Sequence, residues 1–376
     1  MQKLVSVSKL EYPSEIYASM WPKELLKCIE HEKSVFVVVD SIAYDKSPDV
    51  RELISILDRN NVQIKKVKTS ESLKSISTVE DICSWLVKKN ADRTSLLIGV
   101  GGGILTDISG FVASIYMRGI RFAHVPTTLL AQVDASIGGK TGVNFLGLKN
   151  MLGVIRQPLF TYVCPAFLKS LARRDFFSGA AELLKTFMIN NDDGAYGRAV
   201  LVLSCISKSK SQDEFEILIK DYELEIAKLV AQAVKVKMDI VSKDQFEQGE
   251  RRKLNLGHTF AHAIESCAML DAQSGIIKNS AKSDVIPKVD ITHGEAVAMG
   301  LVLAASMSEK QGFARQGFRE QIESDLRSCG METDCPFDKL MLLNAMRHDK
   351  KSTGDKVNFV LMRSVGDVVV VPAKMR

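Results

Sequence analysis

Short apolar runs alternate with amphipathic stretches through the first third of the chain. Residues 34–40 form a continuous β-branched run that ends in a carboxylate, a pattern typical of a buried parallel strand. Stretches with apolar residues at helical spacing lie between this run and further runs of the same kind, and the alternation predicts an α/β fold. The expected strands are 34–40, 62–67, 95–100 and 121–125, and the expected helices are 49–60, 79–89 and 104–117.

The pattern changes beyond residue 165, where long helical periodicities predominate. The expected helices are 175–190, 212–241, 256–268, 294–310 and 317–328, and residues 357–362 and 367–371 predict a terminal hairpin. Residues 271–290 are polar and irregular, which predicts a surface excursion. We therefore expect two domains, 1–164 and 165–376.

Residues 134–150 are rich in Gly, Lys and Asn and lack helical periodicity. We interpret this segment as a long structured loop, and such loops usually carry function. Lys140 and Lys149 indicate an anion, although exposed, solvated lysines would give the same pattern.

Three consecutive glycines, 101–103, lie between a predicted strand and a predicted helix. This arrangement favours phosphate binding, because glycine lets the backbone approach closely and a helix N-terminus presents free N–H groups. The cluster is not a Rossmann fingerprint, since the best strand-end carboxylate, Asp40, precedes it instead of following it. The hydroxyls of Thr127 and Thr128 follow the next strand and could bond a ribose or a phosphate.

The chain of 376 residues is 46% hydrophobic and 25% charged, as globular proteins are, and its net charge is +5. No long basic block is present, so the composition favours a small acidic substrate over nucleic acid. The seven scattered cysteines suit reduced thiols. No secretory core and no apolar run long enough to span a bilayer is found, and we expect a cytoplasmic protein that does not enter a membrane.

Three of the six histidines fall within residues 258–293. His258 and His262 are four residues apart, so on a helix they share a face and favour a metal or anion site. Thr259 occupies the position where a metalloprotease motif requires Glu, which argues against peptide hydrolysis. Glu182 and Lys185 share another helical face, as a surface ion pair or as a ligand and a base.

Several motifs occur together in one order along the chain. They are Gly101-Gly102-Gly103 with Asp107, Pro126-Thr127-Thr128, Gly138-Gly139-Lys140-Thr141-Gly142-Val143-Asn144, Ala181-Glu182, Gly257-His258-Thr259 and His293-Gly294-Glu295. In these motifs the chain resembles the 3-dehydroquinate synthases, a family of sugar-phosphate cyclases, over about residues 34–366.

The resemblance implies an N-terminal NAD-binding α/β domain and a mainly α-helical C-terminal domain that binds metal and substrate. It assigns one divalent metal, Zn or Co, to Glu182, His258 and His293, and it moves His262 from the metal to the substrate. The positions it implies for NAD are Asp40, Glu71, Lys74, Gly102, Gly103, Asp107, Thr127, Thr128, Lys140 and Lys149. The implied catalytic and substrate contacts are Asp134, Lys140, Lys149, Asn150, Lys185, Lys237, Arg251, Asn255, His262 and Lys350, with Arg118 reaching the neighbouring subunit of a homodimer.

The implied reaction converts 3-deoxy-D-arabino-heptulosonate 7-phosphate to 3-dehydroquinate and phosphate, a step of the shikimate pathway and aromatic amino acid biosynthesis. It would proceed by transient oxidation with NAD, phosphate elimination, reduction and aldol ring closure. Three other readings stay open: a sister cyclase making a valiolone or an inosose, an iron-dependent polyol dehydrogenase, and a non-catalytic scaffold.

Overall fold

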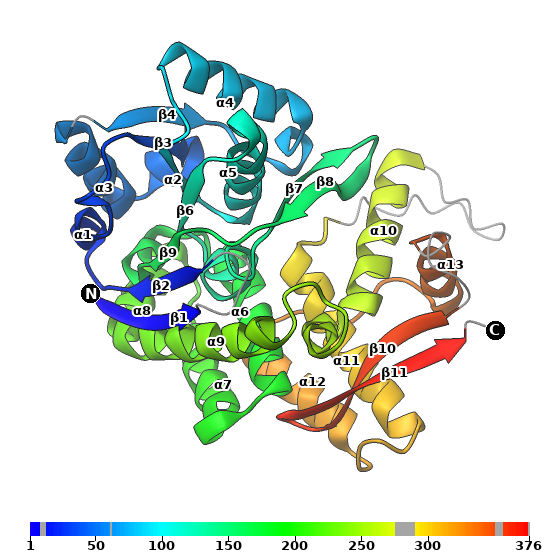
Figure 1. Ribbon diagram of the computed structural model, residues 1–376. Coiled ribbons are helices and arrows are strands. Elements are labelled where there is room, and N and C mark those ends of the chain that lie inside the picture. Colours follow the sequence, from blue (N-terminus) through cyan, green and yellow to red (C-terminus); the bar gives the residue numbers. More distant parts are fainter. Residues whose placement is uncertain (8–12, 61, 275–289, 350–355, 375–376) are drawn as a thin grey trace. The chain divides into compact units, whose positions relative to one another are not determined.

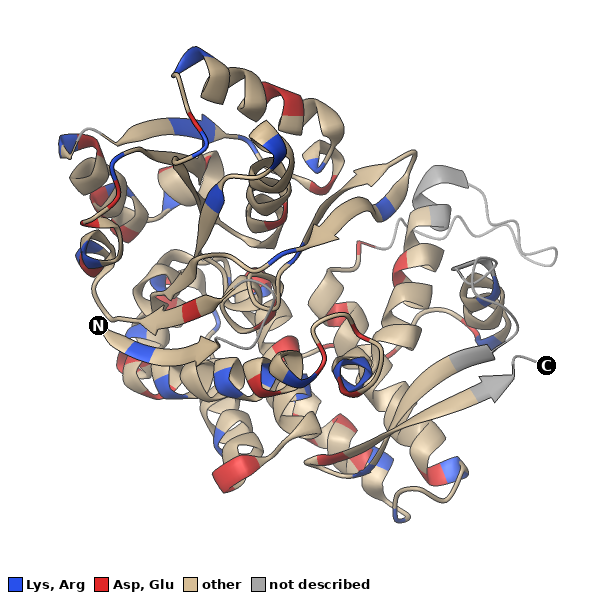
Figure 2. Ribbon diagram, in the orientation of Figure 1, with Lys and Arg blue, Asp and Glu red and all other residues tan. Residues whose placement is uncertain are grey.

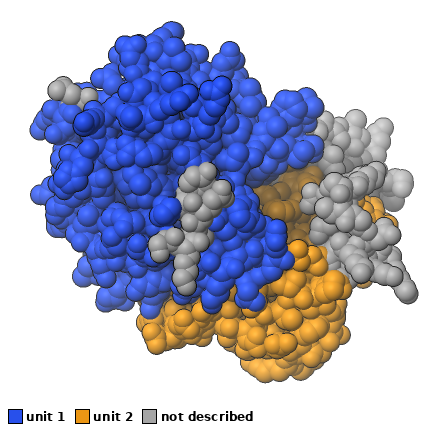
Figure 3. Space-filling view, viewed as in Figure 1, with its two compact units in different colours: residues 1–179, 209–250 blue, residues 180–208, 251–376 orange. Residues whose placement is uncertain are grey.

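The structure, a computed structural model, describes residues 1–7, 13–60, 62–274, 290–349 and 356–374. The chain forms two compact units (Figure 3). Residues 1–179 and 209–250 make the first, and residues 180–208 and 251–376 make the second. The units interleave along the chain, whereas the expected domains use a single cut at residue 165. The assignment of NAD to 1–164 and of metal and substrate to 165–376 stays a prediction.

The first unit is built on a seven-stranded sheet of order β1-β2-β9-β6-β5-β3-β4 (Figure 1). Its strands are β1 (Gln2–Val7), β2 (Ser14–Ala18), β3 (Val35–Asp40), β4 (Gln63–Val67), β5 (Leu96–Gly101), β6 (Arg121–Pro126) and β9 (Phe160–Val163). Only β1 pairs antiparallel with its neighbour; the pairs from β2 to β4 are parallel. The four strands expected from the sequence are confirmed within one or two residues at their ends.

Both faces of the sheet are buried, which explains the continuous apolar runs. Val37 and Val39 point into one core with the apolar face of α3 (Pro48–Arg59). Phe36 and Val38 point into the opposite core, which α4 (Ile76–Lys88) and α5 (Gly103–Ile115) cover. The α/β prediction is therefore confirmed for this unit.

The prediction of a loop over 134–150 is wrong for much of its length. After a single π-helical turn (Ala131–Ala135), β7 (Lys140–Phe145) and β8 (Leu148–Ile155) form an antiparallel hairpin. Its two-residue turn has positive φ at Leu146 (50°) and Gly147 (79°), as a type I′ turn requires. A Cβ on Gly142 would lie 2.5 Å from the carbonyl oxygen of Leu152, so the glycine that hid the strand pattern is what lets the strands approach.

The prediction of one helix over 212–241 is also wrong. The segment forms α8 (Gln212–Asp221) and α9 (Glu223–Lys243), separated at Tyr222, whose φ and ψ of −95° and 10° leave the helical range. Both helices belong to the unit that contains the sheet. The shorter helices of this unit are α1 (Leu26–Ile29) and α2 (Ser41–Lys46).

The second unit is mainly helical, as expected. It contains the end of α6 (Arg173–Ile189), then α7 (Ala195–Ile206), α10 (His258–Ser274), α11 (His293–Lys310), α12 (Phe318–Ser328) and α13 (Lys339–Asp349). The predicted terminal hairpin is confirmed as β10 (Lys356–Ser364) and β11 (Asp367–Lys374). The sequence patterns missed α7, α13, β1, β2 and β9. Of the predicted excursion 271–290, residues 275–289 lie outside the described residues.

Three further features of the structure concern charge, cysteines and helix length. Basic and acidic residues are interspersed along the helices of both units (Figure 2). All seven cysteines are free thiols. None of the helices in the described part of the chain has the length and apolar character needed to cross a bilayer.

Candidate metal centre and nucleotide-binding edge

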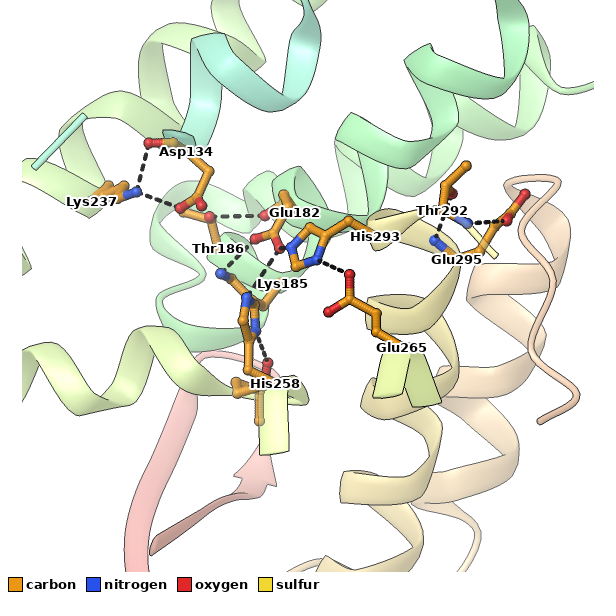
Figure 4. Close-up of polar contacts among 11 residues, drawn as sticks. Asp134, Glu182, Lys185, Thr186, Lys237, His258, Glu265, Thr292, His293 and Glu295 are labelled. Carbon is orange, nitrogen blue, oxygen red and sulfur yellow. Dashed lines mark hydrogen bonds and ion pairs between the residues drawn. The ribbon is translucent and has the colours of Figure 1, made fainter. Parts of the chain in front are cut away.

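The three predicted metal ligands come together in the second unit (Figure 4). Glu182 lies in α6 and is fully buried, and His258 and His293 are the first residues of α10 and α11. One ligand atom from each residue lies within 4.8 Å of the other two. A cluster of this composition, with the carboxylate buried and both histidines half-buried, is a candidate metal centre.

Local structure fixes where the two histidines stand. Gly257, with φ of +75°, turns the chain into α10, and a capping box between Thr292 and Glu295 begins α11 immediately before His293. The helices approach closely because Gly300 has no side chain: a Cβ there would collide with the carbonyl oxygen of Gly257. The His258 and His293 rings consequently lie 5.5 Å apart, centroid to centroid.

The donor set fits a divalent metal. Glu182 Oε1 lies 3.4 Å from His258 Nε2 and 3.2 Å from His293 Nε2. Metal–ligand bonds of roughly 2.1 Å at tetrahedral angles would separate neighbouring ligand atoms by roughly 3.4 Å. The second carboxylate oxygen, Oε2, has Lys185 Nζ at 2.5 Å, which leaves Oε1 for the metal. One carboxylate and two imidazoles suit zinc or cobalt.

Burial and neighbouring charges shift the pKa values of these groups. Burial raises the pKa of Glu182, but Lys185 and the two histidines outweigh it and hold the pKa well below its ordinary value. Burial lowers the pKa of His258 to about 3. Burial also disfavours the charged form of His293, but hydrogen bonds to Glu182 and Glu265 prevail and raise its pKa to about 10. Glu182 and His258 therefore already hold the protonation states that a metal requires.

The spacing of Glu182 and Lys185 allowed a surface ion pair, but the structure shows that the pair is not on the surface. The Glu182 and Lys185 side chains are 0% and 2% exposed. An ion pair removed from water in this way is costly to form, so it is seldom retained for stability alone. The alternative, in which the pair is a ligand and a base, stays a prediction.

In the first unit, the predicted nucleotide-binding residues gather at the carboxyl edge of the parallel sheet. Asp40 ends β3, Gly101 ends β5 and Thr127 follows β6, and these three strands are neighbours. The strand order reverses between β3 and β5, because β4 extends the sheet on one side of β3 and β5 lies on the other. Open α/β sheets bind ligands at such a switch point.

The close packing of this edge explains its glycines. A Cβ on Gly101 would lie 3.0 Å from the Asp40 Cβ, and one on Gly102 would lie 3.2 Å from the Thr128 Cγ2. Gly102 caps α5 without a side-chain hydrogen bond, so the first N–H groups of that helix face the edge. Asp40 accepts hydrogen bonds from Ile42 N (2.9 Å) and Thr69 Oγ1 (2.7 Å).

Further predicted residues are joined by hydrogen bonds in the same unit. Lys74 Nζ donates to Asp107 Oδ2 at 2.6 Å and to Asn150 Oδ1 at 2.5 Å. Asn144 in β7 donates to Glu71 Oε1 at 2.8 Å and so links the hairpin to the segment that contains Lys74. Burial raises the pKa of Asp107 to about 6, although Lys74 opposes the shift.

Two predicted substrate lysines pair with acids in the first unit. Lys237 Nζ, buried, donates to the Asp134 backbone oxygen at 2.7 Å and also to its carboxylate (Figure 4). Lys140 forms an ion pair with Glu247. Each of these lysine side chains is therefore held by a charge-assisted hydrogen bond, and its role as a substrate contact stays a prediction.

The other predicted residues are placed as follows. Arg251 is buried, Asn255 is half-buried, and His262, Lys149, Asn150 and Arg118 are exposed. The His262 ring lies 5.5 Å from the His258 ring. Lys350 lies outside the described residues.

The sequence patterns did not single out two acids in these networks. Glu247 pairs with Lys140, and the only signal was a polar stretch after a long helix. Glu265 contacts His293, and its spacing of seven from His258, two helical turns, could have placed it on the ligand face.

The chain matches known proteins over most of its length. The sequence-family model of the 3-dehydroquinate synthase N-terminal region matches residues 64–178, and that of the C-terminal region matches residues 179–352. A 3-dehydroquinate synthase from Dictyoglomus thermophilum is 33% identical over 367 residues, covering 98% of this chain and 93% of the relative.

Solved structures show the same fold. A 2-deoxy-scyllo-inosose synthase complexed with carbaglucose-6-phosphate, NAD+ and Co2+ superposes with a TM-score of 0.77 at 21% identity, covering 100% of this chain and 97% of that one. A 2-epi-5-epi-valiolone synthase from Streptomyces hygroscopicus with NAD+ and Zn2+ gives 0.78 at 23% identity, covering 96% and 93%. Because the identity to the dehydroquinate synthases is higher and the two models together span most of the sequence, the chain belongs to the 3-dehydroquinate synthase family.

Proposed function

We propose that the protein converts 3-deoxy-D-arabino-heptulosonate 7-phosphate to 3-dehydroquinate and phosphate, with NAD and one divalent metal, Zn or Co, as cofactors. The observation that carries the proposal is the cluster of buried Glu182 with the half-buried His258 and His293 in a chain of this family. A scaffold protein would have no need to bury a carboxylate and an ammonium beside two imidazoles, because burying charged groups is costly.

Each cofactor has a proposed position. Glu182, His258 and His293 would hold the metal, which when bound polarises a substrate hydroxyl. Asp40, Gly102, Gly103, Thr127 and Thr128 would bind NAD, which supplies reversible hydride transfer at a ring carbon. The proposed NAD contacts also include Glu71, Lys74 and Asp107.

The chain's own cations would bind the two ends of the substrate. A phosphate and a carboxylate must both be held while the ring is remade, and charge-assisted hydrogen bonds do this best. We assign these contacts to Lys140, Lys149, Lys237 and Arg251, with Asp134, Asn150, Lys185, Asn255, His262 and Lys350 around the ring. Holding both reacting carbons lowers the entropic barrier to ring closure.

The proposed assembly is a cytoplasmic homodimer in which Arg118 completes the neighbouring subunit's site. Arg118 is exposed and has φ of +68°. A non-glycine residue in that region costs free energy, so the surrounding turn holds it in place. Mixing inactive Arg118→Ala with inactive Glu182→Gln subunits would restore part of the activity only if sites are shared.

The reaction is tested by phosphate release from the heptulosonate phosphate with purified protein and NAD far below the substrate concentration. We expect many turnovers per NAD and no accumulation of NADH, because the hydride returns to the substrate. An iron-dependent polyol dehydrogenase would instead accumulate NADH in proportion to product, and that result would refute the proposal.

A further inference from the structure

The two histidines of the metal centre are anchored in different ways. His258 Nδ1 lies 3.2 Å from the backbone oxygen of Leu256. A carbonyl oxygen only accepts, so this contact keeps the proton on Nδ1 and leaves the Nε2 lone pair toward Glu182. For His293 the equivalent contact is made by a side chain: Nδ1 lies 3.4 Å from Glu265 Oε1.

Glu265 is well placed to act on His293. It lies in α10, two turns beyond His258, while His293 begins α11. Its side chain is 13% exposed, and in Figure 4 its carboxylate points toward the His293 ring from the side opposite Glu182. The His293 ring thus lies between two carboxylates, with Nε2 toward Glu182 Oε1 and Nδ1 toward Glu265 Oε1.

We propose that Glu265 is a positioning residue of the metal centre: it fixes the Nδ1–H tautomer and the ring orientation of His293, so that Nε2 faces the metal. Carboxylates that accept from the second ring nitrogen of a ligand histidine make that ligand more basic and hold its ring. The inference rests on the proposed metal centre. It also explains how α10 supports both histidines, one as its own first residue and one through Glu265.

The test measures Co2+ binding to metal-free protein by visible absorption and by competition with a chelator, so it does not depend on activity. We expect Glu265→Ala to weaken Co2+ binding by about 10- to 100-fold and to shift the cobalt absorption bands. Glu265→Gln should lose much less, because its amide oxygen still accepts from Nδ1–H at the same side-chain length. If the Glu265 side chain only filled space, Glu265→Gln would bind Co2+ as wild type does and Glu265→Ala would show no shift of the cobalt bands. The band shift in Glu265→Ala therefore separates the two roles.

Glu320→Ala in α12 is the matched control, since it removes the same charge from a side chain that is 61% exposed. It should bind Co2+ as wild type does.

Wild-type affinity and absorption bands in Glu265→Ala would overturn the proposal without affecting the proposed metal centre. If wild-type protein binds no Co2+, the metal centre itself fails. Should Glu265→Ala not fold, Glu265→Asp replaces it, because its shorter side chain withdraws the carboxylate from Nδ1; unchanged affinity and bands there would equally overturn the proposal.

Discussion

Single side chains would set the chemistry of the proposed metal centre. His258 Nε2 lies 3.4 Å from Glu182 Oε1, and its anchored ring has few other orientations. We predict that His258→Ala sharply reduces the metal content of the purified protein, by at least tenfold in affinity, because two ligands remain where three are needed. Elemental analysis after dialysis measures this. Full retention of metal would reject the ligand assignment, and the matched variant His31→Ala, at a side chain that is 92% exposed, should retain it.

The carboxylate of Asp40 should decide the choice of nucleotide. Its position at the end of β3 suits hydrogen bonds from ribose hydroxyls and repels a 2′-phosphate. We predict that NAD binds about tenfold or more tightly than NADP, the loss expected for one charged interaction. In Asp40→Asn the ratio of NAD affinity to NADP affinity should fall, while the side chain still caps α2. Nucleotide titrations with both proteins decide the point, and equal wild-type affinities would count against this role.

Residues of this kind could be predicted from the sequence only where the family motifs named them. Glu182, His258 and His293 come from three distant segments, and spacing alone favoured His262 over Glu182 as a partner of His258. The motifs corrected that choice, and the structure then brought the three side chains together. Glu247 and Glu265 lie outside the motifs that were used, and their partners Lys140 and His293 are remote in the sequence.

Close contact between helices governs how accurately the ligands are placed. Gly300 in α11 packs on Gly257, the residue that precedes His258. We predict that Gly300→Ala destabilises the protein by about 1 to 3 kcal/mol, because the new Cβ forces the helices apart. The same shift should weaken metal binding, because it moves His258 away from His293. Chemical denaturation and Co2+ titration measure the two effects.

Gly197→Ala provides the control for that substitution. Gly197 lies inside α7, and no atom stands within 4 Å of the position a Cβ would take. Replacing glycine by alanine in an open helical position should stabilise the protein by about 0.5 to 1 kcal/mol and leave metal binding unchanged. If Gly300→Ala behaved in the same way, the close contact would not be needed.

Strands and helices could be predicted where the positions of apolar residues match the buried positions. The runs that became β3 and β5 are buried on both faces, so they stand out. The β7–β8 hairpin did not, because Gly142 and Gly153 face each other and carry no side chain to mark the strand. The break at Tyr222 was hidden as well, because the apolar periodicity continues from α8 into α9.

The division of the chain into two interleaved units cannot be found from any local sequence pattern. Residues 209–250 belong with the sheet although they follow residues 180–208 of the other unit. Composition changes near residue 165, but composition does not record which helices pack together. The two family models together match residues of both units.

We propose that this protein is a dehydroquinate synthase and not a sister cyclase. The two differ in the substrate group that lies farthest from the phosphate. A dehydroquinate synthase must bind a carboxylate. The proposed contacts Lys237 and Arg251 are both buried, and the planar fork of Arg suits two carboxylate oxygens. Sedoheptulose 7-phosphate and glucose 6-phosphate offer no carboxylate, and losing one charge-assisted hydrogen bond to the substrate costs about 1.5 to 3 kcal/mol, roughly ten- to hundredfold in kcat/KM.

The most direct measurement is therefore a side-by-side assay of the three sugar phosphates, with phosphate release followed over time and each product identified by mass. We predict turnover of 3-deoxy-D-arabino-heptulosonate 7-phosphate, little or none of the other two, and a loss of that preference in Arg251→Ala. Turnover of sedoheptulose 7-phosphate at a comparable kcat/KM would contradict the account and assign the protein to the valiolone-forming cyclases.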